Sequence, residues 1–304
     1  MKVVPLAAES LGTRSMATWI GCSNNKVNFL IDPGVSLAKK RFGLKPHVLE
    51  VERNLDHWTR ICTHLEKSKY VIVSHYHYDH YNPRNPGVLR GKILFVKSPK
   101  LINKSQRMRS RYFLEQVKDR VAEINHADWR SFELEENIEL RFSGALPHGR
   151  EGSKQGFVVS TTIVKGKDIF THTSDVLGIQ AEVQLQYLLD QDPTILYVDG
   201  PMVRSSRNIA KKELQKCISS LETIIGKTQV KKIIIDHHLL RSLNWRDHLT
   251  DLLRTASSAD VVVSTAAEFL GERNDLLEAN RHLLYQEQKV NSRPTVTSYH
   301  QQDK

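Results

Sequence analysis

The stretch Tyr70-Val-Ile-Val-Ser-His-Tyr-His-Tyr-Asp-His80 places three imidazoles and a carboxylate directly behind an apolar run. The apolar part is typical of a short buried strand, and polar rings grouped near a core need partners. An extended or loop backbone projects His75 and His77 to one side, and a following turn lets Asp79 and His80 face elsewhere. The pattern H-x-H-x-D-H therefore predicts metal ligation, with His75 and His77 on one ion and Asp79 and His80 on a second.

The composition is that of an ordinary globular chain. Of 304 residues, 39% are hydrophobic and 26% charged, which is enough apolar material for a large buried core. Apolar runs stay far below the ~20 residues that cross a bilayer, so we expect no membrane segment and no membrane partner. The N-terminal apolar stretch 3–8 ends at Glu9, too early for a secretory signal, and the expected location is the cytoplasm.

Positive charge is concentrated in one part of the chain. Lys and Arg total 44 against 34 Asp and Glu, a net charge of +10. The stretch 97–120 holds eight of these cations against Glu115 and Asp119, so it contributes +6. A basic patch of this kind attracts phosphates, and nucleic acid is therefore a candidate partner. A solvated helix face explains the same pattern, and the sequence leaves both interpretations open.

The periodicity of apolar residues indicates mixed sheets covered by helices. Early strands follow one another through short turns, whereas later strands alternate with helices, and this order predicts an α/β fold with a four-layer αββα sandwich. We expect one domain over residues 1–288 and a polar C-terminal tail over 289–304. The predicted strands are 2–6, 16–21, 26–31, 70–74, 92–96, 138–143, 156–164, 168–171, 194–198, 230–236 and 260–264. The predicted helices are 48–67, 99–120, 180–190, 207–225, 244–257 and 273–288.

The histidine cluster and the strand before it resemble the signature of the metallo-β-lactamase superfamily. The resemblance runs from Val3 to about Gly271 and is closest to an archaeal-type group of that superfamily. It implies that Asp32 orients the histidine loop, that His148 completes the first metal site, and that Asp175 bridges two ions. The final histidine of the second site is implied at His237 or His238.

The choice within this last pair stays open, because adjacent residues at a strand end point in opposite directions. We favour His237, whose spacing to Arg241 is similar to a His-x-x-x-Arg arrangement in the tRNA-processing nuclease branch. The other histidine and Asp236 would then support a ligand without binding metal. The flavodiiron branch carries Glu where this chain has His77, which argues against redox chemistry.

The resemblance implies a hydrolase with two divalent ions, of which zinc is the first expectation and manganese or iron are alternatives. Ions about 3.5–4 Å apart lower the pKa of a shared water, and Asp79 and Asp175 would act at this centre. His172 or the non-ligating member of the His237/His238 pair is a candidate proton donor. Candidates for binding an anionic group are Arg14, Arg150 and Arg241, although each alone is more typical of a structural cation.

Three functions fit these residues. The first is hydrolysis of a phosphodiester, in nucleic acid or a nucleotide, which the basic stretch 97–120 favours. The second is hydrolysis of a lactone, thioester or other acyl compound by the same metals. The third is a metal-binding or nucleic-acid-binding protein without catalysis, which a complete ligand set argues against. The sequence names neither the substrate nor the metal nor the oligomeric state.

Overall fold

The computed structural model describes residues 1–203 and 208–291. Its first half forms a six-stranded sheet in the order β1-β2-β3-β4-β5-β6. β1 to β3 pair antiparallel, and β3 to β6 pair parallel through crossover helices. The strands are β1 (Lys2–Pro5), β2 (Thr18–Cys22), β3 (Val27–Ile31), β4 (Tyr70–Val73), β5 (Ile93–Val96) and β6 (Glu123–His126). The crossovers are α1 (Val48–Lys67) between β3 and β4, the 3-10 helix Pro86–Leu89 between β4 and β5, and α2 (Lys104–Val117) between β5 and β6.

The second half forms a seven-stranded sheet in the order β15-β14-β13-β12-β11-β8-β7. It is antiparallel from β7 to β12 and parallel from β12 to β15. Its strands are β7 (Ser131–Leu134), β8 (Ile138–Phe142), β11 (Thr161–Lys165), β12 (Asp168–His172), β13 (Ile195–Asp199), β14 (Lys232–Asp236) and β15 (Val262–Ser264). A small ribbon pairs β9 (Leu146–Pro147) with β10 (Phe157–Val158). The helices are α3 (Glu182–Gln191), α4 (Asn208–Lys227), α5 (Thr250–Ser258), α6 (Ala266–Phe269) and α7 (Leu277–Asn291).

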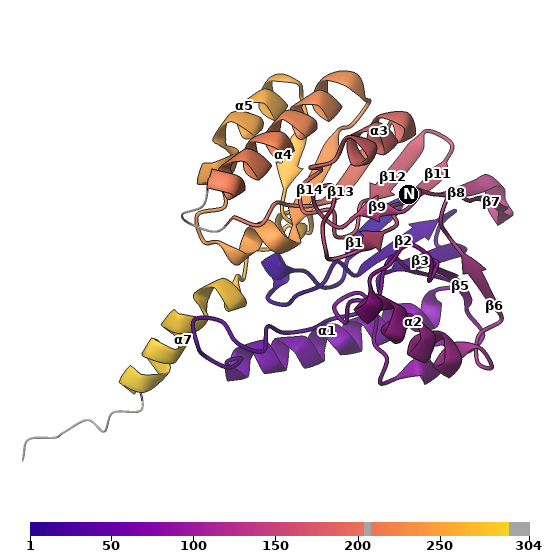
Figure 1. Ribbon diagram of the computed structural model, residues 1–304, viewed down its shortest axis with the longest axis horizontal. Helices are drawn as coiled ribbons and strands as arrows, with labels where there is room; N and C mark the ends of the chain where they lie inside the picture. The colour runs from indigo at the N-terminus through magenta and orange to yellow at the C-terminus, as the bar shows by residue number, and fades with distance from the viewer. Residues whose placement is uncertain (204–207, 292–304) are drawn as a thin grey trace, which may run out of the picture.

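The two sheets pack face to face and each is covered by helices on its outer side (Figure 1). A central apolar cluster, which includes Phe29, Ile72, Phe170 and Ile234, contains buried side chains of both sheets. Two further clusters lie under α1 and α2 and under α3 to α5. Burial of apolar surface on both faces of each sheet holds the layers together. The expected four-layer αββα sandwich is therefore confirmed.

Several predicted boundaries are wrong. The helix expected over 99–120 spans only Lys104–Val117, and the strand expected over 156–164 is divided between β10 and β11. β6 and β7 were not predicted, because both are short, half-exposed strands with few apolar residues. α7 continues to Asn291, beyond the start of the tail expected at 289, and the rest of that tail lies outside the described residues. No helix in the described part of the chain has the length and apolarity to span a membrane.

Candidate metal centre

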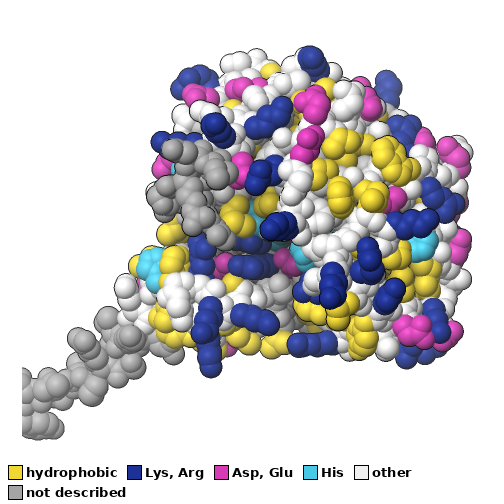
Figure 2. Space-filling view, viewed as in Figure 1, with side chains coloured by type: hydrophobic (Ala, Val, Ile, Leu, Met, Phe, Trp, Pro, Cys, Tyr) yellow, Lys and Arg dark blue, Asp and Glu magenta, His cyan; other side chains and the backbone are white. Residues whose placement is uncertain are grey.

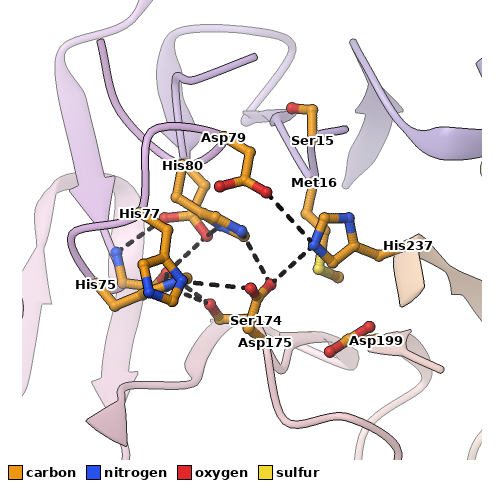
Figure 3. A network of polar contacts seen from close by, with 12 residues as sticks. Ser15, Met16, His75, His77, Asp79, His80, Ser174, Asp175, Asp199 and His237 are labelled. Carbon is orange, nitrogen blue, oxygen red and sulfur yellow. Dashed lines mark hydrogen bonds and ion pairs between the residues drawn. The ribbon is translucent and has the colours of Figure 1, made fainter. Parts of the chain in front are cut away.

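The candidate site lies at the carboxyl ends of β4, β12 and β14, where three segments distant in sequence meet (Figure 3). Parallel strands end at a common edge, and loops that leave this edge gather polar side chains. The loop after β4 carries the histidine cluster, the turn after β12 carries Asp175, and β14 is followed by His237 and His238. The topology thus brings these polar segments to one place.

A first group consists of His75, His77, His148 and Asp175, whose ligand atoms all lie within 4.8 Å of one another. His75 Nε2 is 3.0 Å from His77 Nδ1. The Oδ2 atom of Asp175 is 3.5 Å from His75 Nε2 and 3.3 Å from His148 Nε2. Three imidazoles and one carboxylate oxygen therefore face a common point.

A second group consists of Asp79, His80 and His237, again with ligand atoms within 4.8 Å. His237 Nε2 is 3.8 Å from Asp79 Oδ2. The other oxygen of Asp175, Oδ1, is 2.9 Å from His80 Nε2 and 3.4 Å from His237 Nε2. Asp175 thus presents one oxygen to each group, which is the arrangement that a carboxylate shared by two cations needs.

The donor atoms fit two divalent ions. His80 Nε2 and Asp175 Oδ1 are buried and close together, yet neither makes a hydrogen bond of acceptable geometry with the described residues. Unsatisfied buried polar atoms are costly, and a cation between them would satisfy both. Burial and neighbouring histidines lower the pKa of His75 to about 4 and that of His77 to about 2. Both rings are therefore neutral at pH 7, as metal ligation requires.

The electrostatic potential around the second group is strongly negative. Burial alone would lower the pKa of His80, but the carboxylates of Asp175 and Asp32 outweigh it and raise that pKa well above its usual value. In the same way Glu9 and Asp175 overcome burial and raise the pKa of His237 to about 10. Protons accumulate where positive charge is favoured, so this potential also favours a bound cation.

Asp32 and two serines hold the histidine loop. Asp32 has a positive φ of 53° and accepts hydrogen bonds from the Ser74 amide (2.8 Å), the Ser74 hydroxyl (2.7 Å) and His80 Nδ1 (2.8 Å). The bond to His80 leaves its Nε2 free for a ligand. The hydroxyls of Ser74 and Ser174 lie 3.1 Å and 3.3 Å from His75 Nδ1, so the opposite nitrogen faces the first group.

Glu9 supports His237 from the far end of the sequence. Its carboxylate accepts hydrogen bonds from His237 Nδ1 at 2.6 Å and from Arg241 Nε at 2.8 Å. Glu9 and His237 are buried and Arg241 is 11% exposed, so the chain of polar contacts runs from the interior to the cleft. Sequence reasoning missed this role, because an isolated Glu between two predicted strands carries no pattern; in the structure it begins the short 3-10 helix Glu9–Leu11.

The structure separates the two adjacent histidines. His237 belongs to the second group, whereas His238 lines the cleft and donates from Nδ1 to Asp199 Oδ1 at 2.9 Å. The ligand atoms of Asp175, His237 and His238 are nevertheless within 4.8 Å of each other. Asp199 was also missed, although it ends β13 beside Asp236 of β14, and a carboxylate at that position was a usable signal.

His172 does not face the cleft, so its expected role as proton donor requires correction. Its Nε2 donates to the Met16 carbonyl at 3.0 Å, and its Nδ1 accepts from the Ser174 amide at 3.1 Å. Both nitrogens are therefore occupied by backbone. Asp236 likewise binds backbone, because it accepts from the His237 amide at 2.7 Å, and burial raises its pKa to about 6.

The three candidate arginines differ in position. Arg14 lines the cleft and donates twice to Glu278, at 2.6 Å and 2.7 Å. Arg241 also lines the cleft and is held by Glu9. Arg150 lies outside this cleft and lines a neighbouring hollow. Its side chain is 70% exposed, and its Nε lies 3.9 Å from Glu213 Oε1. An anion bound in the cleft would therefore not contact Arg150.

The cleft above the metal groups has a volume of about 720 Å³. Its floor contains ligand residues of both groups together with His238. Figure 2 shows Lys and Arg side chains around a hollow in which His and acidic side chains are visible. Among the residues that line the cleft, the cations are Arg14, Lys39, Arg84, Arg109 and Arg241, and the larger apolar side chains are Leu37, Leu55, Trp58 and Tyr78.

No protein-family model matches the sequence. The chain is 40% identical over 303 residues to a UPF0282 protein of Methanocaldococcus jannaschii, covering 96% of this chain and 99% of that one. It is 38% identical over 289 residues to a UPF0282 protein of Korarchaeum cryptofilum, covering 94% and 95%. These relatives confirm the expected archaeal group.

Solved structures confirm the fold. The metallo-β-lactamase fold protein YhfI from Bacillus subtilis superposes with a TM-score of 0.51 at 12% identity, covering 86% of this chain and 95% of that one. CmlA, a diiron beta-hydroxylase from Streptomyces venezuelae, superposes with a TM-score of 0.50 at 11% identity, covering 82% and 51%. The identities with the archaeal proteins extend over almost the whole chain, and the chain therefore belongs to the UPF0282 family, with a metallo-β-lactamase fold.

Proposed function

We propose that the protein is a hydrolase that cleaves phosphodiesters with two divalent ions, zinc in the first instance. The observation that carries this proposal is Asp175, whose two oxygens face two separate sets of histidines. His75, His77 and His148 would hold one ion with Asp175, and Asp79, His80 and His237 the other. CmlA, which is a diiron enzyme, supports a two-metal centre on this fold.

When bound, two such ions lower the pKa of a water at the site and polarise the scissile group. The residues of the chain orient this centre. Asp32 and Glu9 bind the Nδ1 atoms of His80 and of His237, so Nε2 of each ring would hold an ion, and such partners also raise the basicity of a ligand. The Asp79 side chain is 16% exposed, against 2% or less for His80, His237 and Asp175, so its carboxylate borders the space that a substrate would enter.

The cations of the cleft favour a phosphodiester over a neutral acyl compound. Arg84 has no side-chain hydrogen bond or ion pair within the described part of the chain, and Arg109 donates only to a backbone carbonyl. Cations without carboxylate partners at the mouth of a cleft raise the local concentration of anions. A lactone or thioester would gain nothing from them, whereas a phosphodiester would.

The direct test is hydrolysis of bis-p-nitrophenyl phosphate by the purified chain. We expect turnover with Zn²⁺ or Mn²⁺, loss of turnover after chelation, and recovery on adding the metal back. p-Nitrophenyl acetate and a lactone panel are measured in parallel. Cleavage of esters or lactones without the diester would replace the proposal by the acyl alternative. Inactivity on every substrate with each metal would instead support a protein without catalysis.

His238 is placed to donate a proton to the leaving group. Its Nδ1 is held by Asp199, its ring lines the cleft, and the first metal group lies beside it, with the His148 ring centroid 6.1 Å away. With Nδ1 donating to Asp199, the Nε2 of the neutral ring faces the cleft without a proton, and burial and Arg241 lower the pKa of His238. His238 would therefore first take the proton that the attacking water releases and then pass it from Nε2 to the leaving group. In this role His238 transfers a proton and does not bind metal.

The loss of activity on replacing His238 with glutamine is therefore expected to depend on the leaving group. A dinucleoside phosphate, which expels an alkoxide, should be cleaved about 100-fold or more slowly, because an alkoxide needs a proton. Bis-p-nitrophenyl phosphate, which expels a stable phenolate, should change little. Metal content, measured by mass spectrometry, should equal that of the wild type. Equal loss on both substrates, or loss of an ion, would make His238 a ligand instead.

A further inference from the structure

The outward face of α2 carries cations that pair with no carboxylate in the part of the chain that the structure describes. Lys104, Arg107 and Arg111 make no side-chain hydrogen bond or ion pair with the described residues. Two large residues lie among them, Met108, which is 65% exposed, and Tyr112, which is 56% exposed. Residues three and four apart share one side of a helix, so these five form one surface, which we call the α2 face. Glu115 continues the same side of the helix, and its carboxylate is paired with Lys118 at 2.7 Å.

The α2 face lies between the cleft and a second hollow. Arg109 of the same helix lines the cleft, with its guanidinium 4.5 Å from the centroid of the Tyr78 ring. On the other side, Arg111 and Tyr112 line an open groove of about 800 Å³, together with residues of β6. Figure 2 shows Lys and Arg side chains interleaved with hydrophobic ones beside the central hollow. An extended ligand that crosses the α2 face would therefore reach from the groove to the cleft above the metal groups.

The N-terminal end of α2 is tied to the loop that follows His148. The Asn103 amide donates to the carbonyls of Lys154 and Gln155, and the Gln106 amide donates to the Gln155 carbonyl at 2.9 Å. Gln155 itself lines the cleft. The α2 face is therefore held in a fixed position relative to the metal groups.

We propose that the α2 face binds single-stranded nucleic acid and leads it into the cleft. Cations without protein partners match a phosphate backbone, and an exposed tyrosine offers a ring on which an unpaired base can stack. The bases of a duplex are not accessible for such stacking. From Lys104 to Tyr112 the helix rises about 12 Å, enough for about three nucleotides. Only the delivery of a phosphodiester to the metals rests on the proposed function; the binding surface does not.

The test is fluorescence anisotropy of a labelled oligothymidine of about 12 nucleotides, a length within the range of known single-strand sites. Phosphorothioate linkages keep the charge and resist cleavage, so the metal-loaded full chain can be used. Exchange of Lys104, Arg107 and Arg111 for glutamine should weaken binding at least about tenfold and flatten the slope of log K against log salt by about 2. Tyr112→Ala should weaken binding at least about fivefold, and Tyr112→Phe should not.

The matched control removes the same charge from the opposite side of the molecule, by exchanging Lys211, Lys212 and Lys227 of α4 for glutamine. This control should bind like the wild type. Equal loss in both triple variants, or none in the α2 variant, would overturn the proposal. Duplex bound as tightly as single strand would refute base stacking, and binding to phosphatidylglycerol vesicles without oligonucleotide binding would replace it by a membrane surface.

Activity on bis-p-nitrophenyl phosphate separates this inference from the proposed function. All α2 variants should retain that activity, because this substrate is too small to need the α2 face. Oligonucleotide binding without any diesterase activity would leave the surface in place and contradict the hydrolase. Diesterase activity without oligonucleotide binding would support the hydrolase and overturn the α2 face as a binding surface.

Discussion

Asp175→Asn is expected to abolish diesterase activity, with a fall in kcat/KM of at least about 1000-fold, equivalent to about 4 kcal/mol of transition-state stabilisation. The amide has nearly the same shape, but it loses the negative charge and offers only one oxygen. In the structure Oδ1 faces His80 and His237 while Oδ2 faces His75 and His148. One of the two groups therefore loses its shared ligand, and metal content should fall below two ions per chain.

The control for this change is Asp251→Asn, which alters the same charge at a surface position. The Asp251 side chain is 77% exposed and pairs only with the exposed Arg254. In the Asp251→Asn protein, activity and metal content should both remain at wild-type levels. An Asp175→Asn protein that keeps two ions and more than about a tenth of the wild-type activity would refute a shared ligand at position 175.

Arg281→Met is expected to cause the largest loss of stability. Arg281 is fully buried and donates to Glu50 twice, each time at 2.7 Å, and to the carbonyls of Ala38 and Leu44. Removing one member of a buried ion pair leaves the other charge uncompensated. The free energy of unfolding of the metal-loaded protein should fall by about 3–5 kcal/mol, measured by urea denaturation with Trp fluorescence.

A second variant distinguishes charge from packing. In the double variant Arg281→Met/Glu50→Gln no uncompensated charge remains. The amide oxygen of the new glutamine can still accept the hydrogen bond that the His47 backbone N–H donates to Glu50. We expect this protein to recover at least about half of the lost free energy. Arg254→Met, in an exposed pair, should leave the urea midpoint unchanged. No recovery in the double variant would mean that the cavity, and not the charge, causes the loss.

The Arg281 site also connects stability to the candidate function. Ala38, whose carbonyl Arg281 binds, belongs to the loop that forms one wall of the cleft. The same helix supplies Glu278, which holds Arg14 at the cleft. α7 lies at the edge of the molecule in Figure 1, yet its side chains position the cleft wall.

The candidate ligands could be found from the sequence because they follow buried strands. Val71 to Val73 form a buried apolar run, and the polar residues directly after it must lie at a sheet edge. The same argument applies to Asp175 after β12 and to His237 after β14. Strand ends and polar side chains are local features, so one sequence is enough to predict them.

The supporting contacts could not be predicted in the same way. Glu9 and His237 are 228 residues apart, and nothing local to Glu9 indicates that its carboxylate meets an imidazole. His172 occupies a strand end as the candidate ligands do, but its ring turns to backbone atoms of Met16 and Ser174. Side-chain direction at a strand end depends on tertiary packing, which the period of a strand does not determine.

Two cations are expected to occupy the two residue groups. Anomalous scattering from crystals of the zinc-loaded chain, recorded on both sides of the zinc edge, tests it most directly. We expect two peaks, one among His75, His77 and His148 and one among Asp79, His80 and His237, with Asp175 between them. A single peak, or peaks away from these side chains in fully loaded protein, would contradict the account.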